Sequence, residues 1–245
     1  MTLLTRGMLA AGLFALTVLL SPLSSAAQQA VDPDADTVLH AMADYMEGLS
    51  RFSVSFDTDA EIIDEAGQKL MLTNAGRITL ERPDKIRVSR ESAFGPVELF
   101  YDGGMLSLFA EEAALYYQMP VQGTIDDLLN TIRGDVGYDA PGADLLYADV
   151  YASLMGNVRS GQHLGMVVLN GVEAHHLAFR TDQVDWQLWV AAGTAPLPLR
   201  YVITSKWVTG APQYAVRLRD WDVAPPVDDA LFSFTPPADA RRIEV

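Results

Sequence analysis

The sequence predicts a mainly β (α+β) fold, in which one antiparallel sheet of about ten strands is accompanied by an N-terminal helix and by two short helices inserted mid-sheet. Three observations predict this class. Apolar and polar residues alternate over most of the chain, which is the period of strands. The connections between these stretches are too short for parallel crossovers. Three segments carry the helical period instead.

The first 27 residues predict a secretory signal peptide. Arg6 supplies a positive charge before an apolar run of 13 residues at 8–20, and small residues follow. Ser24 fits the first small-residue position before a cleavage site, so cleavage is expected near Ala26 or Ala27. The alternative is a membrane anchor, but the run is shorter than the roughly 20 residues that cross a bilayer. We therefore expect a soluble, exported protein, periplasmic in a double-membrane bacterium.

The first helix is predicted from Asp36 onward. Asp36 or Thr37 is available as its N-cap, and Gly48 stands near its end. Apolar residues recur between them at helical spacing, namely Val38, Leu39, Met42, Met46 and Leu49. This pattern predicts one amphipathic helix.

The first half of the sheet is predicted to follow that helix. Its strands are expected at 52–57, 69–80, 86–88, 97–101, 106–108 and 115–119. Turn residues separate them at 65–68, 82–84 and 102–104. We therefore expect an antiparallel meander.

Two short helices are predicted to interrupt the meander. Residues 124–133 begin with a Thr-x-x-Asp arrangement that resembles a capping box. Pro141-Gly142 opens the second helix and Gly156-Asn157 ends it. Its apolar stripe consists of Leu145, Leu146, Val150, Leu154 and Met155.

The second half of the sheet is expected after these helices. Its strands are predicted at 164–169, 172–180, 184–191, 199–208 and 213–221. Asn170-Gly171 is the strongest hairpin signal in the chain. Because no long linker and no internal repeat is present, residues 28–245 are predicted to form a single domain.

Composition excludes several classes of function. The chain has 17 Lys+Arg against 32 Asp+Glu, a formal net charge of -15, so nucleic acid is an unsuitable partner. It has no cysteine, which excludes disulfides, thiolate metal sites, thiol catalysis and a lipid-modified N-terminal cysteine.

Motifs of chemistry are absent from the sequence. No two of the four histidines have the spacing of a helical zinc site, and His175 and His176 are expected on opposite faces of one strand. Asp32 begins a stretch like a calcium loop, but Thr37 replaces the required glycine. No nucleophile elbow or phosphate loop follows a strand. We therefore predict no catalytic residue, no metal site and no cofactor.

Several strands are apolar on both faces, including residues 99–101, 115–117 and 186–190. An antiparallel sheet of this kind must be covered on both sides or enclose something. Two interpretations remain open on the residues alone. The large side chains fill a core, or they line an apolar cavity under the inserted helices.

Short phrases resemble the outer-membrane lipoprotein carrier (LolA/LolB-like) superfamily. Residues 82–88 (RPDKIRV) resemble its proline-led strand entry, and 99–103 its Asp-Gly hairpin. Residues 196–200 (PLPLR) resemble its Pro-Leu-Arg strand, and 231–237 (LFSFTPP) its C-terminal ending. The whole mature chain is also similar to a bacterial family of predicted periplasmic proteins that is classed as a domain of unknown function.

The resemblance implies a curved antiparallel half-barrel around a hydrophobic cavity, with the helices as a lid. Members of the superfamily are said to carry lipoprotein acyl chains, to bind other lipids or to sense envelope stress through a partner. The carriers are thought to hold the lid shut with a basic residue on the sheet, to which none of Arg77, Arg87 and Arg90 can be matched. Fold does not imply function.

The resulting hypothesis is a soluble periplasmic binding or carrier protein for an apolar ligand, either a lipid or a lipidated polypeptide. We expect a monomer. Candidate cavity-wall residues, chosen by sheet face, are Phe52, Phe56, Leu99, Tyr101, Leu108, Tyr117, Trp186, Leu188 and Trp207. Candidate lid residues are Ile125, Leu128, Leu129, Ile132, Leu146 and Val150.

Two alternative functions stay open. An envelope sensor or protein-interaction module would hold a protein partner on the sheet edge or on the acidic surface. A cofactor-free enzyme on the same scaffold would have a small polar pocket containing a carboxylate, or His175, with a shifted pKa.

Overall fold

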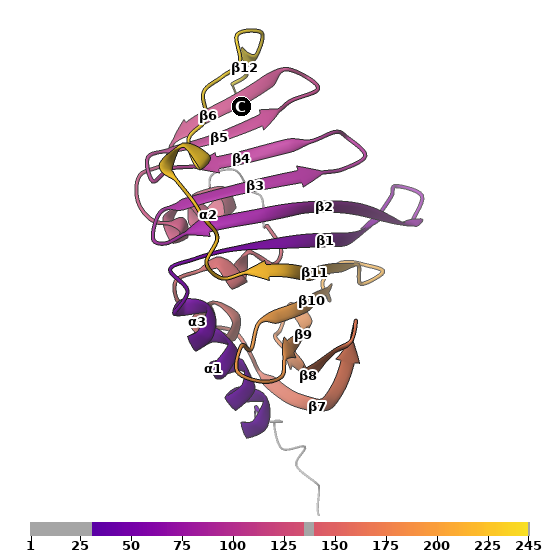
Figure 1. Cartoon of the computed structure of the whole chain (residues 1–245). Helices are drawn as coiled ribbons and strands as arrows, with labels where there is room; N and C mark the ends of the chain where they lie inside the picture. The colour runs from indigo at the N-terminus through magenta and orange to yellow at the C-terminus, as the bar shows by residue number, and fades with distance from the viewer. Residues whose placement is uncertain (1–30, 135–139, 245) are drawn as a thin grey trace, which may run out of the picture.

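The computed structural model describes residues 31–134 and 140–244. Within them twelve strands form one open, curved sheet in the order β12-β6-β5-β4-β3-β2-β1-β11-β10-β9-β8-β7 (Figure 1). Neighbouring strands are antiparallel except β12 and β6, which are parallel. The predicted mainly β half-barrel fold is confirmed. The signal peptide predicted for residues 1–27 lies outside the described residues.

The chain enters the sheet at its middle and builds it outward in two halves. β1 (Arg51–Ile63) pairs with both β2 (Lys69–Glu81) and β11 (Gln213–Asp222). The first half continues through β3 (Lys85–Glu91), β4 (Val97–Tyr101), β5 (Met105–Ala110) and β6 (Leu115–Pro120). Helical segments then lead to the opposite edge, and the second half returns through β7 (Ser160–Leu169), β8 (Val172–Arg180), β9 (Val184–Ala191) and β10 (Pro198–Ser205).

Helix α1 (Pro33–Glu47) begins earlier than predicted, because Asp32 rather than Asp36 or Thr37 is its N-cap. The Asp32 carboxylate accepts a hydrogen bond from the backbone N–H of Asp34 at 3.0 Å. Pro33 occupies the first helical position, where its missing N–H costs nothing. The acidic approach to the helix is thus a cap, and the helix ends at Gly48 as predicted.

The first inserted helix, α2 (Ile125–Gly134), is confirmed together with its cap. The backbone N–H of Thr124 donates to the Asp127 carboxylate at 2.8 Å, and the N–H of Asp127 donates to the Thr124 hydroxyl at 3.3 Å. These reciprocal bonds make the Thr-x-x-Asp stretch a capping box.

The second inserted helix was predicted wrongly as one continuous helix. The structure divides it into a 3₁₀ turn, η1 (Ala143–Leu146), and a short helix, α3 (Val150–Met155). Tyr147 between them has ψ 156°, which is extended backbone. Asp149 then starts a new helix by accepting from the N–H of Ala152 at 2.7 Å. In the described ranges, no helix is long and apolar enough to cross a bilayer.

Strand β10 is shorter than predicted, which moves one candidate residue out of the sheet. It ends at Ser205, because Gly210 and Ala211 form a turn with positive φ angles of 88° and 45°. Trp207 therefore lies in this connection and is 71% exposed. The 3₁₀ turn η2 (Asp229–Leu231) and β12 (Arg241–Arg242) were not predicted, since two or three residues carry no detectable period.

Candidate functional site

A cavity of about 1030 Å³ lies between the inner face of the first half of the sheet and the inserted helical segments. Its walls come from β1 to β6 and β11, and α2 and η1 cover it. This volume is at the upper end of the range for small-molecule sites. Aliphatic and aromatic side chains make most of the lining, and among the described lining residues the one charged side chain is Arg90.

Three rows of cross-strand partners form the sheet wall of the cavity. The central row runs through Val54, Ile78, Val88, Leu99, Leu108 and Tyr117, each paired with the next and all lining the cavity. The flanking rows lie two residues to either side and contribute Phe52, Ile86, Leu106 and Met119, and Phe56, Arg90, Val97, Ala110 and Leu115. The two-residue period of the strands therefore places every second residue in the wall.

Gly76 allows Phe56 to lie flat against the sheet. Its backbone is directly opposite Phe56 in the β1–β2 pairing. A Cβ atom at Gly76 would lie 2.5 Å from the Phe56 ring and 2.0 Å from the Ser89 carbonyl oxygen, closer than atoms can approach. Glycine at this position therefore lets the Phe56 ring pack against β2 while it forms part of the cavity wall.

Five of the nine candidate wall residues line this cavity: Phe52, Phe56, Leu99, Leu108 and Tyr117. Tyr101 is on the same sheet face but is fully buried, and its hydroxyl donates to the Gly123 carbonyl at 2.9 Å. It supports the approach to α2 instead of contacting the cavity.

The remaining three wall candidates lie elsewhere. Trp186 and Leu188 are on β9, in the second half of the sheet. Both are buried core residues, and Trp186 also borders a second, smaller pocket. Helix α1 covers that half, since it contacts β7, β8 and β9. Trp207 is exposed in the β10–β11 connection. The large apolar side chains thus line a cavity in the first half of the sheet and belong to the core in the second half.

Four of the six candidate lid residues line the cavity: Leu128, Leu129, Ile132 and Leu146. Ile125 and Val150 are buried but do not line it. The backbone N–H of Ile125 donates to the Pro83 carbonyl at 2.9 Å, and that of Val150 donates to the Glu47 carboxylate at 2.9 Å. These hydrogen bonds attach the start of α2 and the start of α3 to the rest of the fold.

Arg82, in the turn between β2 and β3, joins the sheet to the lid. Its guanidinium donates to the backbone carbonyls of Leu146 and Tyr147, both at 3.2 Å. Burial lowers the pKa of Arg82, and the nearby carboxylates of Asp126 and Glu47 oppose that shift. These contacts fasten the end of η1 to the rim of the sheet.

The sequence did not identify Arg82 as the basic residue that contacts the helical segments, because the candidates on the sheet were Arg77, Arg87 and Arg90, whereas Arg82 falls in a predicted turn. Arg77 donates to the hydroxyls of Ser53 and Ser55, and Arg87 pairs with Glu98 at 2.8 Å. Arg90 lines the cavity. The one sequence feature that could have pointed to Arg82 is its position before Pro83, at the start of the RPDKIRV stretch that resembles the superfamily.

Further polar contacts hold α3 against α1. The Tyr151 hydroxyl donates to the Asp36 carboxylate at 2.6 Å, and its ring stacks on His40 with centroids 3.6 Å apart. This hydrogen bond is the largest cause of a pKa of about 12 for Tyr151. The helical segments are thereby attached at both the α1 side and the sheet rim.

The neighbouring histidines contact different groups, as their alternation predicted. A ring nitrogen of His175 lies 3.0 Å from one of His163, whereas His176 pairs with the Gln187 amide at 2.9 Å and stacks on Trp189. Burial lowers the pKa of His175. Within residues 31–134 and 140–244, no group of three or more His, Asp or Glu side chains could hold a metal ion.

The sequence was compared with models of protein families and with curated proteins. Residues 35–245 match the family model described as "Predicted periplasmic protein (DUF2092)". No curated protein matches the sequence.

Solved structures resemble this fold at low sequence identity. An uncharacterized conserved protein from Thermus thermophilus superposes with a TM-score of 0.52 and 12% identity, over 86% of this chain and 98% of that one. The lipoprotein LppX of Mycobacterium tuberculosis has a TM-score of 0.48 and 14% identity, over 80% and 100%. A LolA superfamily protein from Nitrosomonas europaea has a TM-score of 0.36 and 11% identity, over 82% and 97%. At these identities the likeness concerns the fold alone.

Proposed function

The chain belongs to the DUF2092 family of predicted periplasmic proteins, and from this premise we propose that it is a periplasmic binding or carrier protein for an apolar ligand. The ligand class is a lipid or a lipidated polypeptide, held without covalent chemistry. The observation that carries the proposal is the cavity of about 1030 Å³ with its wall of aliphatic and aromatic side chains.

The cavity favours long apolar chains for an energetic reason. Each methylene transferred from water contributes about 0.8 kcal/mol, so ten methylenes contribute roughly 8 kcal/mol before the entropic cost of association. Few polar groups in the wall compete for that surface. Affinity therefore follows chain length more than headgroup detail, and selectivity among lipids is broad.

The lid gives the ligand a route in and out. Leu128, Leu129 and Ile132 close the cavity from α2, while Arg82 attaches the following segment to the sheet rim. The two Arg82 hydrogen bonds are made to backbone carbonyls, which water can bond to when the lid moves, at a net cost of about 1 kcal/mol per bond. Opening the lid at this point therefore leaves no carbonyl unpaired.

Arg90 supports an amphiphile with an acidic end as the preferred lipid. It is the charged side chain in the described lining, and it makes no ion pair with any residue that the structure describes. A carboxylate or phosphate would supply the missing countercharge.

Replacement Arg90→Gln should weaken palmitate binding about tenfold and leave methyl palmitate binding unchanged, as measured by displacement of a fluorescent fatty-acid probe. Arg77→Gln is the control, because Arg77 does not line the cavity and bonds to Ser53 and Ser55 instead.

The function is tested by purifying residues 28–245 from a periplasm without detergent, followed by organic extraction and mass spectrometry. Near-stoichiometric lipid or acylated peptide supports the proposal. A spectrum without lipid, together with no displacement of the fluorescent probe by any fatty acid, contradicts it and favours the protein-interaction alternative. The variant Leu108→Trp, which fills the wall from its central row, serves as the blocked reference for both measurements.

A further inference from the structure

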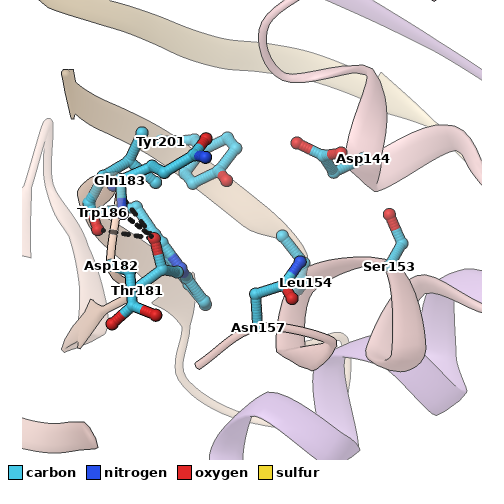
Figure 2. A pocket seen from close by; sticks show the side chains of 10 residues that line it. Asp144, Ser153, Leu154, Asn157, Thr181, Asp182, Gln183, Trp186 and Tyr201 are labelled. Carbon is cyan, nitrogen blue, oxygen red and sulfur yellow. Dashed lines mark hydrogen bonds between the residues drawn. The ribbon is translucent and has the colours of Figure 1, made fainter. Parts of the chain in front are cut away.

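A second, smaller pocket of about 330 Å³ lies beside the second half of the sheet. Asp144 and Ser153 face it from the helical segments, Gln183 from the β8–β9 turn and Tyr201 from β10 (Figure 2). Leu154, Asn157, Thr181, Asp182, Val184 and Trp186 complete the lining. In contrast to the large cavity, most of these side chains are polar.

Tyr201 is the residue that marks this pocket as a binding site. It is only 3% exposed, yet its hydroxyl makes no hydrogen bond to any residue that the structure describes. Figure 2 shows this hydroxyl directed into the space between the strands and Asp144. Burial holds the pKa of Tyr201 well above its ordinary value. Because the Tyr201 hydroxyl opens onto the pocket, a ligand bound there can supply its hydrogen-bond partner.

The other polar groups around it offer both donors and acceptors. The side-chain amides of Asn157 and Gln183 each supply one acceptor and two donor hydrogens, and neither amide bonds to a side chain that the structure describes. The Thr181 hydroxyl, by contrast, is already engaged, because it closes the β8–β9 turn by bonding to Gln183 and Val184. A ligand in this pocket therefore meets both hydrogen-bond donors and hydrogen-bond acceptors.

The charges of the pocket are already balanced. Asp144 pairs with Arg133 at 3.3 Å, and Asp182 pairs with Arg159 at 2.7 Å. Neither arginine lines the pocket, so an anionic ligand would find no cationic side chain there. A cationic ligand would add a third positive charge without a free carboxylate to neutralise it. Both arguments favour a neutral ligand.

The same residues do not form a catalytic arrangement. Ser153 lines the pocket without a histidine beside it, and Asp144 is engaged by Arg133. Burial raises the pKa of Asp144, which is the feature expected of the enzyme alternative, and the interactions with Arg133 and with the Ser153 hydroxyl oppose that shift. The Asp144 carboxylate is thus held by an arginine, and no histidine lines the pocket to relay a proton from Ser153. The pocket is therefore suited to binding.

We propose that this pocket binds a neutral, hydroxyl-rich group of about monosaccharide size, with the Tyr201 hydroxyl as its buried hydrogen-bond partner. Each ligand hydroxyl both donates and accepts, which matches the mixed lining. A volume of about 330 Å³ is at the lower end of small-molecule sites and suits a single sugar or cyclitol ring. The inference goes beyond the proposed function, because the pocket is separate from the apolar cavity.

The hydroxyl-rich group has two possible sources, a free polyol or the headgroup of a lipid bound in the large cavity. The two sites are adjacent: η1 places Asp144 in the small pocket and Leu145 in the large one. Tyr201 is also the cross-strand partner of Val216, which lines the large cavity. The shared chemistry is the polyol, and the experiment distinguishes its source.

The test compares the mature chain with its Tyr201→Phe variant. Saturation-transfer NMR and calorimetry measure binding of methyl β-glucoside, myo-inositol and glycerol, and displacement of the fluorescent fatty-acid probe measures binding of a monoglucosyl diacylglycerol and of diacylglycerol with the same chains. Loss of one neutral hydrogen bond should weaken binding of the hydroxyl-bearing ligand about fivefold. Tyr45→Phe removes a hydroxyl outside the pocket and is the matched control, and Gln183→Leu is a second pocket variant.

Each outcome supports or overturns the proposal. Weaker binding of a free polyol in Tyr201→Phe identifies a site for free polyols. Weaker binding of the glucosyl lipid alone, with diacylglycerol unchanged, identifies a headgroup site. If no hydroxyl-bearing probe binds more weakly to either pocket variant than to the native chain, the proposal is wrong. The fatty-acid probe alone reports on the large cavity, so this failure is distinguishable from failure of the proposed function.

Discussion

Truncation of one leucine in each half of the sheet should destabilise the protein unequally. Leu188 is fully buried beneath the helices, so Leu188→Ala removes packed atoms and leaves a new void, with an expected loss of about 3 kcal/mol. Leu108 is only half-buried and already faces the cavity, so Leu108→Ala mainly reduces its transfer free energy, by about 1 kcal/mol. The difference between the variants measures how far one half is filled and the other open.

Urea denaturation of lipid-extracted protein, followed by far-ultraviolet circular dichroism, measures the free energy of unfolding of each variant, and thermal denaturation measures its melting temperature. For a chain of this size the Leu188→Ala variant should melt roughly 6–12 °C lower and the Leu108→Ala variant about 2–4 °C lower. Equal losses in the two variants would refute the division into filled and open halves, because they would show that Leu108 is packed as tightly as Leu188. A bound lipid should increase the loss for Leu108→Ala alone, since only that side chain would contact it.

Three further predictions concern the lid and its attachments. Replacing Leu128 and Leu129 by Asp should abolish uptake of the fluorescent fatty acid while far-ultraviolet dichroism stays native, and unchanged uptake would contradict their role in closing the cavity. Arg82→Met should raise the dissociation rate of that probe about tenfold in stopped-flow measurements, because two hydrogen bonds to the lid are lost; an unchanged rate would show that Arg82 does not restrain the lid. The pKa of Tyr151 is raised to about 12, above the ordinary value of 10, so its stabilisation is complete below pH 10 and disappears as pH rises through 12. Tyr151→Phe should therefore reduce the steepness of the stability loss over that interval in pH-dependent denaturation, and identical slopes would argue against the assignment.

The cavity wall could be predicted in part because it depends on local periodicity. Alternation along β1, β4, β5 and β6 identifies which residues share a face, and short turns make their strands neighbours. This is why Phe52, Phe56, Leu99, Leu108 and Tyr117 were found together. The same reasoning applied to β9 gave Trp186 and Leu188, which alternate in the same way but lie beneath packed helices.

The position of polar partners was not accessible to sequence reasoning. Arg82 contacts carbonyls more than sixty residues away, and Tyr201 faces Asp144 across the second pocket. No spacing in the sequence relates these residues. Their association depends on how η1 and Tyr147 pack against the sheet.

The sequence by itself determined the antiparallel meander, its interruption by helical segments, the capping box at Thr124 and the Asn170-Gly171 hairpin. Those features follow from side-chain period and turn chemistry within a few residues. Only the tertiary structure decided that α1 covers the second half of the sheet, leaving a cavity over the first, and that the second inserted helix breaks at Tyr147. Packing between distant segments decides such matters, because an apolar strand face has the same pattern whether a helix or a ligand covers it.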